Sequence, residues 1–201
     1  MRRGVRGRVV VAAGAGLAVA AGLFLTGVGT DRDGGAPAGR GGGLRAAADA
    51  EVLAVGARAA APALAGADLD GNPVSLEALR GEVVVLNVWG SWCAPCRAEA
   101  DDLGRLSGQT RGQGVRFLGI NTRDRDRSAA RSFVRAHGLD FPSLHDPDGA
   151  LLLRFPPAQL NPASIPSTLV IDRAGRVAVA IGGSVTDGQL RPLIARVVAE
   201  R

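Results

Sequence analysis

The chain has two cysteines, Cys93 and Cys96, whose type and spacing suit them to chemistry. They follow an apolar, largely β-branched run over residues 82–89, which predicts a short buried strand. Residues 98–106 then combine good helix formers with apolar side chains at roughly helical spacing. The sequence therefore places the cysteine pair where a strand ends and a helix begins.

That position predicts the chemistry of the pair. The unpaired N–H groups and partial positive charge of a helix N-terminus stabilise an anion, and the thiolate is the nucleophilic form of cysteine. We expect Cys93 to be an exposed attacking residue whose pKa falls from about 8.5 toward neutrality. Cys96, one turn deeper, would be shielded and would resolve the mixed disulfide. Pro95 suits the first helical turn, where a missing N–H costs little.

Two other readings of the cysteine pair stay open at this point. A structural disulfide is one, although so small a loop removes little entropy from the unfolded chain. A zinc site is the other, but only His137 and His145 remain as further ligands of the usual kind, at unsuitable spacing. We expect no metal and no organic cofactor.

The N-terminal segment has the layout of an export signal. Four arginines lie among the first eight residues, and the uncharged, apolar run 9–30 follows them. The run is also long enough to span a bilayer, so residues 1–30 are either a signal peptide or a membrane anchor. Residues 31–59, which begin rich in glycine, are expected to be a flexible linker, and 60–201 a single folded domain. The domain would then be anchored at the extracytoplasmic face of the cell membrane or secreted.

The charge of the chain argues against nucleic acid as a partner. The formal net charge is +5, and every cationic side chain counted is arginine. Residues 1–59 carry 8 arginines against 4 acids, whereas residues 60–201 carry 16 against 15. The predicted domain is thus nearly neutral, and it has no basic stripe with interleaved aromatic residues.

Three stretches of the chain resemble the TlpA/ResA group of membrane-associated thioredoxin-like oxidoreductases, over roughly residues 60–201. They are residues 70–76, the active-site run 86–99 and the segment 165–168. The resemblance implies an α/β, thioredoxin-like fold: a central mixed β-sheet flanked by helices, with an N-terminal β-hairpin and a central αβ insertion.

The resemblance also implies roles for individual residues. Cys93 would attack, Cys96 would resolve, and Pro166, in cis, would pack opposite the sulfurs. The substrate groove would be formed by Trp92, Ala94, Pro95 and Ile165. An ordinary trans-proline before an edge strand is the alternative for Pro166.

Glu99 is the remaining candidate, because the group has a glutamate three residues past the second cysteine that tunes proton transfer. A typical thioredoxin instead has an aspartate where this chain has Asn87, which cannot ionise. We therefore expect Glu99 to be the main carboxylate coupled to the thiols, with a pKa raised by burial and by a nearby thiolate. The alternative is a solvated glutamate that complements the helix dipole.

The rest of the domain is predicted from periodicity and turn residues. Ser128 would cap a helix to His137, and Thr186 would cap a last helix to about Ala199. The run 123–127 alternates arginine with aspartate and is expected to be a solvated turn without a binding role. The predicted strands are 115–121, 139–145, 169–171 and 177–181.

The sequence thus predicts an extracytoplasmic thiol–disulfide oxidoreductase acting on protein substrates. The resemblance favours a reductant supplied by a membrane thiol donor, in a process such as cytochrome c maturation. An oxidant of the same fold is the rival reading. A thiol peroxidase and a docking module without enzyme activity are further alternatives.

Overall fold

The computed structural model describes residues 50–200. The predicted signal or anchor at 1–30, and most of the linker that follows it, lie outside these residues. Within residues 50–200, no helix has both the length and the apolar character needed to cross a membrane.

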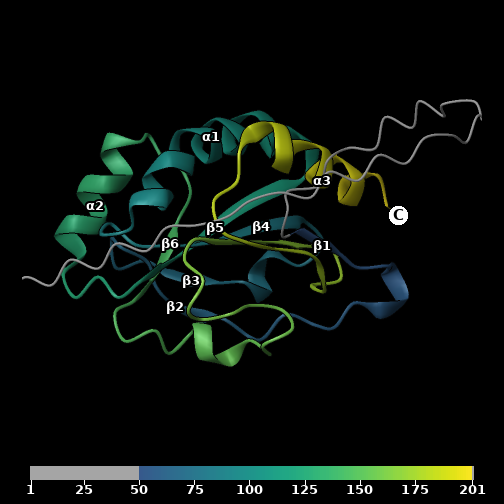
Figure 1. The fold of residues 1–201 in the computed structure, drawn as a ribbon, viewed down its shortest axis with the longest axis horizontal. Coiled ribbons are helices and arrows are strands. Elements are labelled where there is room, and N and C mark those ends of the chain that lie inside the picture. Colours follow the sequence, from purple (N-terminus) through teal and green to yellow (C-terminus); the bar gives the residue numbers. More distant parts are fainter. Residues whose placement is uncertain (1–49, 201) are drawn as a thin grey trace, which may run out of the picture. The chain divides into compact units, whose positions relative to one another are not determined.

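A six-stranded mixed sheet forms the centre of the fold, in the order β1-β8-β7-β4-β5-β6 (Figure 1). Strand β4 lies in its middle, parallel to β5 and antiparallel to β7. The strands are β1 (Ala50–Val52), β4 (Val83–Trp89), β5 (Val115–Thr122), β6 (Ser143–Asp146), β7 (Ser167–Ile171) and β8 (Val177–Gly182). Every residue of β4 is buried, as its apolar sequence predicts for a strand covered on both faces.

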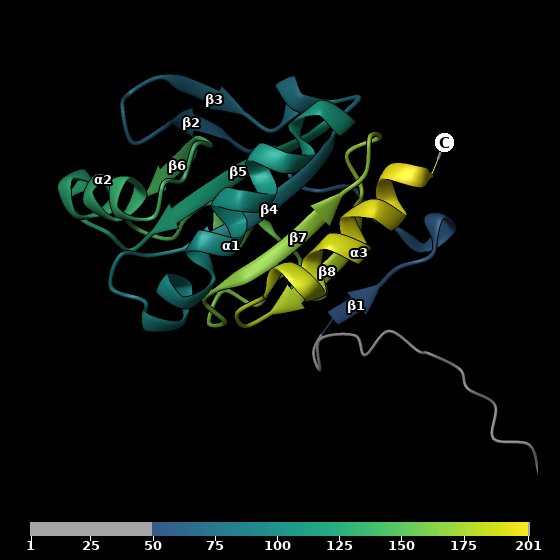
Figure 2. The ribbon, with the colours of Figure 1, turned by 90° about the horizontal axis from the view of Figure 1, so that it is seen from above.

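Three α-helices cover one face of this sheet (Figure 2). They are α1 (Ala94–Thr110), α2 (Arg127–Ala136) and α3 (Asp187–Ala199). Side chains alternate along a strand, so Val83, Val85 and Trp89 pack together with the helices in one core cluster. Asn87 has the same parity and therefore points toward the helix layer.

The opposite face carries a second core cluster, to which Val84, Leu86 and Val88 belong. A two-stranded hairpin, β2 (Ala65–Ala67) and β3 (Pro73–Ser75), and the short 3₁₀ helices η2 (Glu77–Leu79) and η4 (Leu152–Arg154) lie on this side. The predicted mixed sheet, N-terminal hairpin and αβ insertion are thus confirmed.

The boundary predicted at residue 60 is wrong by about ten residues, because the end of the supposed linker belongs to the domain. Strand β1 pairs with β8 at the edge of the sheet. Arg58 is buried, with its guanidinium 2.6 Å and 2.8 Å from the two carboxylate oxygens of Glu200 and 3.2 Å from Asp172. A three-residue strand in an alanine-rich stretch has too little pattern to be recognised, and the partners of Arg58 are far away in sequence.

The helix starts differ in how well they were predicted. Thr186 caps α3 in a capping box with Gln189, as expected. Helix α2 is capped by Asp126, whose Oδ1 accepts the Ser128 N–H at 2.8 Å, so Ser128 is not the cap. Aspartate and serine both suit this position, and the choice between neighbouring candidates depends on backbone geometry.

Candidate active site

Cys93 and Cys96 lie at the junction of β4 and α1 and are joined in a disulfide. Cys93 is the N-cap of α1, and its Sγ accepts the backbone N–H of Cys96 at 3.1 Å. Pro95 stands in the first turn of the helix. The strand-to-helix placement predicted for the pair is therefore confirmed, and one N–H of the first helical turn, that of Cys96, points at the sulfur of Cys93.

The expected difference in exposure between the two cysteines is not found. Cys93 is only 3% exposed and Cys96 only 1% exposed in the disulfide form. Cys93 is covered because its Sγ lies 3.8 Å from the backbone oxygen of Ile165, on the loop that enters β7. Its neighbour Trp92 is 49% exposed, so a partner meets the indole beside a recessed sulfur.

The Ile165–Pro166 peptide is cis, and the Ile165 carbonyl contacts Cys93, which brings this loop against the cysteine pair. Ala94 and Pro95 are exposed at the start of α1, on the same surface as Trp92. The Trp92 indole N–H donates to the Thr122 carbonyl at 3.2 Å, which holds the ring at the end of β5. The residues expected to line the groove are thus adjacent.

Glu99 is buried beneath the active site, with 2% of its surface exposed. Its Oε1 accepts from Asn87 Nδ2 and its Oε2 from the Val185 N–H, both at 2.8 Å. Burial raises the pKa of Glu99 to about 7, although these two hydrogen bonds oppose the rise. The solvated alternative is therefore wrong. Glu99 lies on the helix face of Cys96, because residues three apart are neighbours on a helix.

Asp124 is a site residue that sequence reasoning missed, since the run 123–127 was expected to be a solvated turn. Asp124 is 6% exposed, and its carboxylate accepts the Ser91 N–H at 2.8 Å and the Ser91 hydroxyl at 2.6 Å. It also accepts from Asn121 Nδ2 at 2.6 Å, and its carbonyl accepts from His145 Nε2 at 2.8 Å. One carboxylate thus fastens the segment before Cys93 to the end of β5.

A positional signal for Asp124 was present in the sequence. β4 and β5 are parallel neighbours, so Ser91 and Asp124 both follow the carboxyl ends of adjacent strands. Loops at these ends converge at the sites of α/β proteins.

No group of three or more metal-ligating side chains is found among residues 50–200. The two histidines considered for zinc have other contacts: His137 Nδ1 lies 2.7 Å from Asp101, and His145 bonds to the Asp124 carbonyl. The two cysteines are bonded to each other. The arrangement around them suits disulfide exchange, which needs no metal.

Comparison with known proteins agrees with this site. The profile of the AhpC/TSA family matches residues 57–180. The thiol-disulfide oxidoreductase ResA of Bacillus thuringiensis is 30% identical over 150 residues, which cover 75% of this chain and 82% of the relative. The chain belongs to the AhpC/TSA family and to its TlpA/ResA-like thiol–disulfide oxidoreductases.

Solved structures of similar proteins extend the likeness to the fold. A secreted thiol-disulfide isomerase from Corynebacterium glutamicum is 33% identical with a TM-score of 0.68, covering 82% of this chain and 96% of that protein. A DsbF homologue from Corynebacterium diphtheriae is 32% identical with a TM-score of 0.65, covering 80% and 96%. This TlpA/ResA-like chain is therefore an enzyme of thiol–disulfide exchange with a thioredoxin-like fold.

The Cys93–Cys96 pair also argues against the alternative of a thiol peroxidase. A peroxidase of related fold uses a cysteine at another position, and this chain has only two cysteines, both in the Cys93–Cys96 pair. The Trp-Cys-x-x-Cys arrangement of the TlpA/ResA-like enzymes accounts for both of them.

Glu99 should make stability depend on pH. The carboxyl has a pKa near 4.5 when unfolded and about 7 when folded, so folding takes up a proton between these values. The free energy of unfolding should therefore fall by up to about 3 kcal/mol as pH rises from 4.5 to above 7, at about 1.4 kcal/mol per pKa unit. Urea denaturation across this range should show a flatter profile for Glu99→Gln, while Glu51→Gln, at an exposed position, keeps the wild-type slope.

Asp124→Asn should destabilise the domain by about 1–3 kcal/mol, because its amide group would face donors that now meet a carboxylate. Asp148→Asn is the matched control, since Asp148 is exposed. Equal midpoints for the two variants in urea would show that Asp124 does not hold the active-site segment.

Proposed function

We propose that this chain reduces disulfide bonds in other proteins outside the cytoplasm. The observation that carries the direction is Glu99, a buried carboxyl whose pKa is raised to about 7, on the helix face of Cys96. A negative charge in a low-dielectric site disfavours a nearby thiolate. A pair whose dithiol form is not stabilised has a low reduction potential and gives up its electrons readily.

The reaction has two exchange steps. The Cys93 thiolate attacks one sulfur of the partner disulfide, which forms a mixed disulfide and releases the first partner thiolate. The Cys96 thiolate then attacks Cys93, which forms the Cys93–Cys96 disulfide and releases the second partner thiolate. Two electrons pass to the partner, and Glu99 is suited to accept the proton of Cys96 because it titrates near neutral pH.

Pro166 and the groove residues would present the partner's disulfide to Cys93. The Ile165 carbonyl lies against the Cys93 sulfur, and the exposed Trp92 ring stands beside it. A partner segment lying between the loop of Pro166 and Trp92 would bring its own sulfur to the recessed Cys93.

The N-terminal segment and the similar proteins bear on where the protein would act and on what would reduce its cysteine pair. The basic and apolar segment at residues 1–30 would deliver the domain across the membrane, as a cleaved signal or an anchor. The similar protein of Corynebacterium glutamicum is described as secreted, which supports this location. A membrane thiol donor would return the pair to the dithiol form, and cytochrome c maturation is the process that the resemblance favours.

The exchange chemistry is tested by trapping its intermediate. Cys96→Ser should accumulate a mixed disulfide between Cys93 and a protein substrate such as insulin, because no resolving thiol remains. Wild type should reduce insulin, and Cys93→Ser should not. If wild type leaves insulin oxidised and Cys96→Ser forms no adduct, the proposed exchange is wrong.

The direction is tested by the reduction potential of the pair against glutathione or dithiothreitol. A reductant should lie well below about −200 mV. Glu99→Gln should raise the potential by about 30 mV or more, which corresponds to a tenfold change in the equilibrium constant. A wild-type potential above about −200 mV would instead indicate an oxidant or isomerase.

A further inference from the structure

Arg123 has an unusual backbone and a defined side-chain contact beside the active site. Its φ is 59°, the only positive value at a non-glycine residue within the described part of the chain. Its guanidinium donates to the Pro162 carbonyl at 3.1 Å, across to the loop that leads to Pro166. Left-handed backbone at an ordinary residue costs about 1 kcal/mol or more and is concentrated at functional sites.

Arg97 is held in a comparable way by the segment that precedes Trp92. It lies in the first turns of α1, and its guanidinium donates to the Ser91 carbonyl at 3.1 Å. Thr122, which precedes Arg123, accepts the indole N–H of Trp92. Two exposed guanidinium groups are therefore placed by backbone carbonyls next to the residue that adjoins Cys93.

Within the part of the chain that the structure describes, these two cations are not neutralised by ion pairs. Neither Arg97 nor Arg123 has a carboxylate within 4.0 Å among residues 50–200. The neighbouring acids are engaged elsewhere, since Asp124 is buried on Ser91 and Asp126 caps α2. The two loops beside Pro166, 155–165 and 182–186, contain no charged residue.

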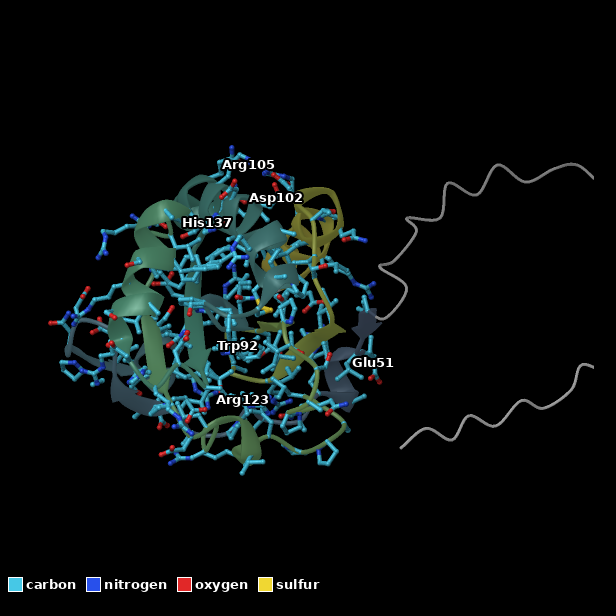
Figure 3. All side chains as sticks on the ribbon, turned by 60° about the vertical axis from the view of Figure 1, so that its left-hand side comes forward. Glu51, Trp92, Asp102, Arg105, Arg123 and His137 are labelled. Atoms are coloured by element: carbon cyan, nitrogen blue, oxygen red, sulfur yellow. A yellow bond between two sulfur atoms is a disulfide. The ribbon has the colours of Figure 1, made fainter. Side chains whose placement is uncertain are left out.

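The paired charges of this face lie apart from these cations. Figure 3 shows Arg123 and the Asp102–Arg105–His137 group on opposite sides of Trp92. Asp102 pairs with Arg105, and His137 contacts Asp101. Arg97 and Arg123 are thus two of the arginines that have no ion-pair partner among residues 50–200, and both lie close to Trp92.

We propose that Arg97 and Arg123 form a cationic rim that selects partner segments carrying acidic side chains next to the disulfide. The inference rests on the proposed exchange with protein partners and names the class of partner. A guanidinium that already bonds one carbonyl keeps further N–H groups for a carboxylate, and it is pre-positioned, so little conformational entropy is lost.

The test uses short peptides with one intramolecular disulfide flanked by glutamate, glutamine or lysine. The second-order rate constant for reduction by the dithiol form is measured at low and at high salt. At low salt the glutamate peptide should react about fivefold to tenfold faster than the lysine peptide, because each exposed ion pair contributes up to about 1 kcal/mol. The ratio should shrink at high salt, which screens exposed charges.

Variants then assign the preference to the rim. Arg123→Gln should lower the glutamate-to-lysine ratio about threefold, Arg123→Glu should lower it further, and Arg123→Lys should retain most of it. Arg176→Gln is the matched control, since Arg176 is also exposed but lies in the turn at the opposite end of β7. Its ratio should equal that of wild type.

These experiments distinguish a failure of the proposed exchange from a failure of the proposed selection of acidic partners. If no peptide is reduced, the proposed exchange fails. If wild type reduces all three peptides at one rate, the exchange stands and the selection of acidic partners is wrong. If Arg123→Lys loses the preference as completely as Arg123→Gln, the contact with Pro162 rather than the charge matters, and the cationic rim is also wrong.

Discussion

The active site depends on the two hydrogen bonds that hold the buried carboxylate of Glu99. A carboxyl with 2% of its surface exposed is costly unless its oxygens are paired, and here each oxygen has one donor. Those donors come from β4 and from the segment before α3, while Glu99 itself belongs to α1. The three elements around the cysteine pair therefore meet at this carboxylate. Adding a proton to it would alter its hydrogen bonds to β4 and to the segment before α3.

Asp124 performs a similar task from the other side of the cysteine pair. It connects the Ser91 segment to the end of β5, as Glu99 connects α1 to β4. The two acids differ in their hydrogen bonds and in their burial. Asp124 accepts three hydrogen bonds, two of them from one residue, whereas Glu99 accepts two under nearly complete burial. The first is suited to holding a loop, and the second to titrating near neutral pH.

Much of this fold could be predicted because its signals are local. The run before Cys93 has the length and β-branched content of a buried strand, and Thr186 begins α3 with a recognisable cap. The position of Glu99 near the cysteine pair was predicted from the resemblance to the TlpA/ResA group, which has a glutamate three residues past the second cysteine. What failed depends on contacts distant in sequence: the pairing of β1 with β8, the burial of Arg58 and the burial of Asp124. The exposure expected for Cys93 failed for the same reason, since Ile165 covers it from 72 residues away.

Glu99 is a buried charged group of the site, whereas Arg97 and Arg123 are exposed. The buried and the exposed groups are suited to different tasks. Glu99 is buried on the helix face of Cys96, where solvent and salt screen little, so in the proposed function its charge would act on the equilibrium between dithiol and disulfide. Arg97 and Arg123 lie at the surface, where salt screens them, so they act on the encounter with a partner. A buried anion and an exposed cationic rim therefore need not cancel. In the proposed function, the first would set how strongly the pair gives up electrons, and the second which protein receives them.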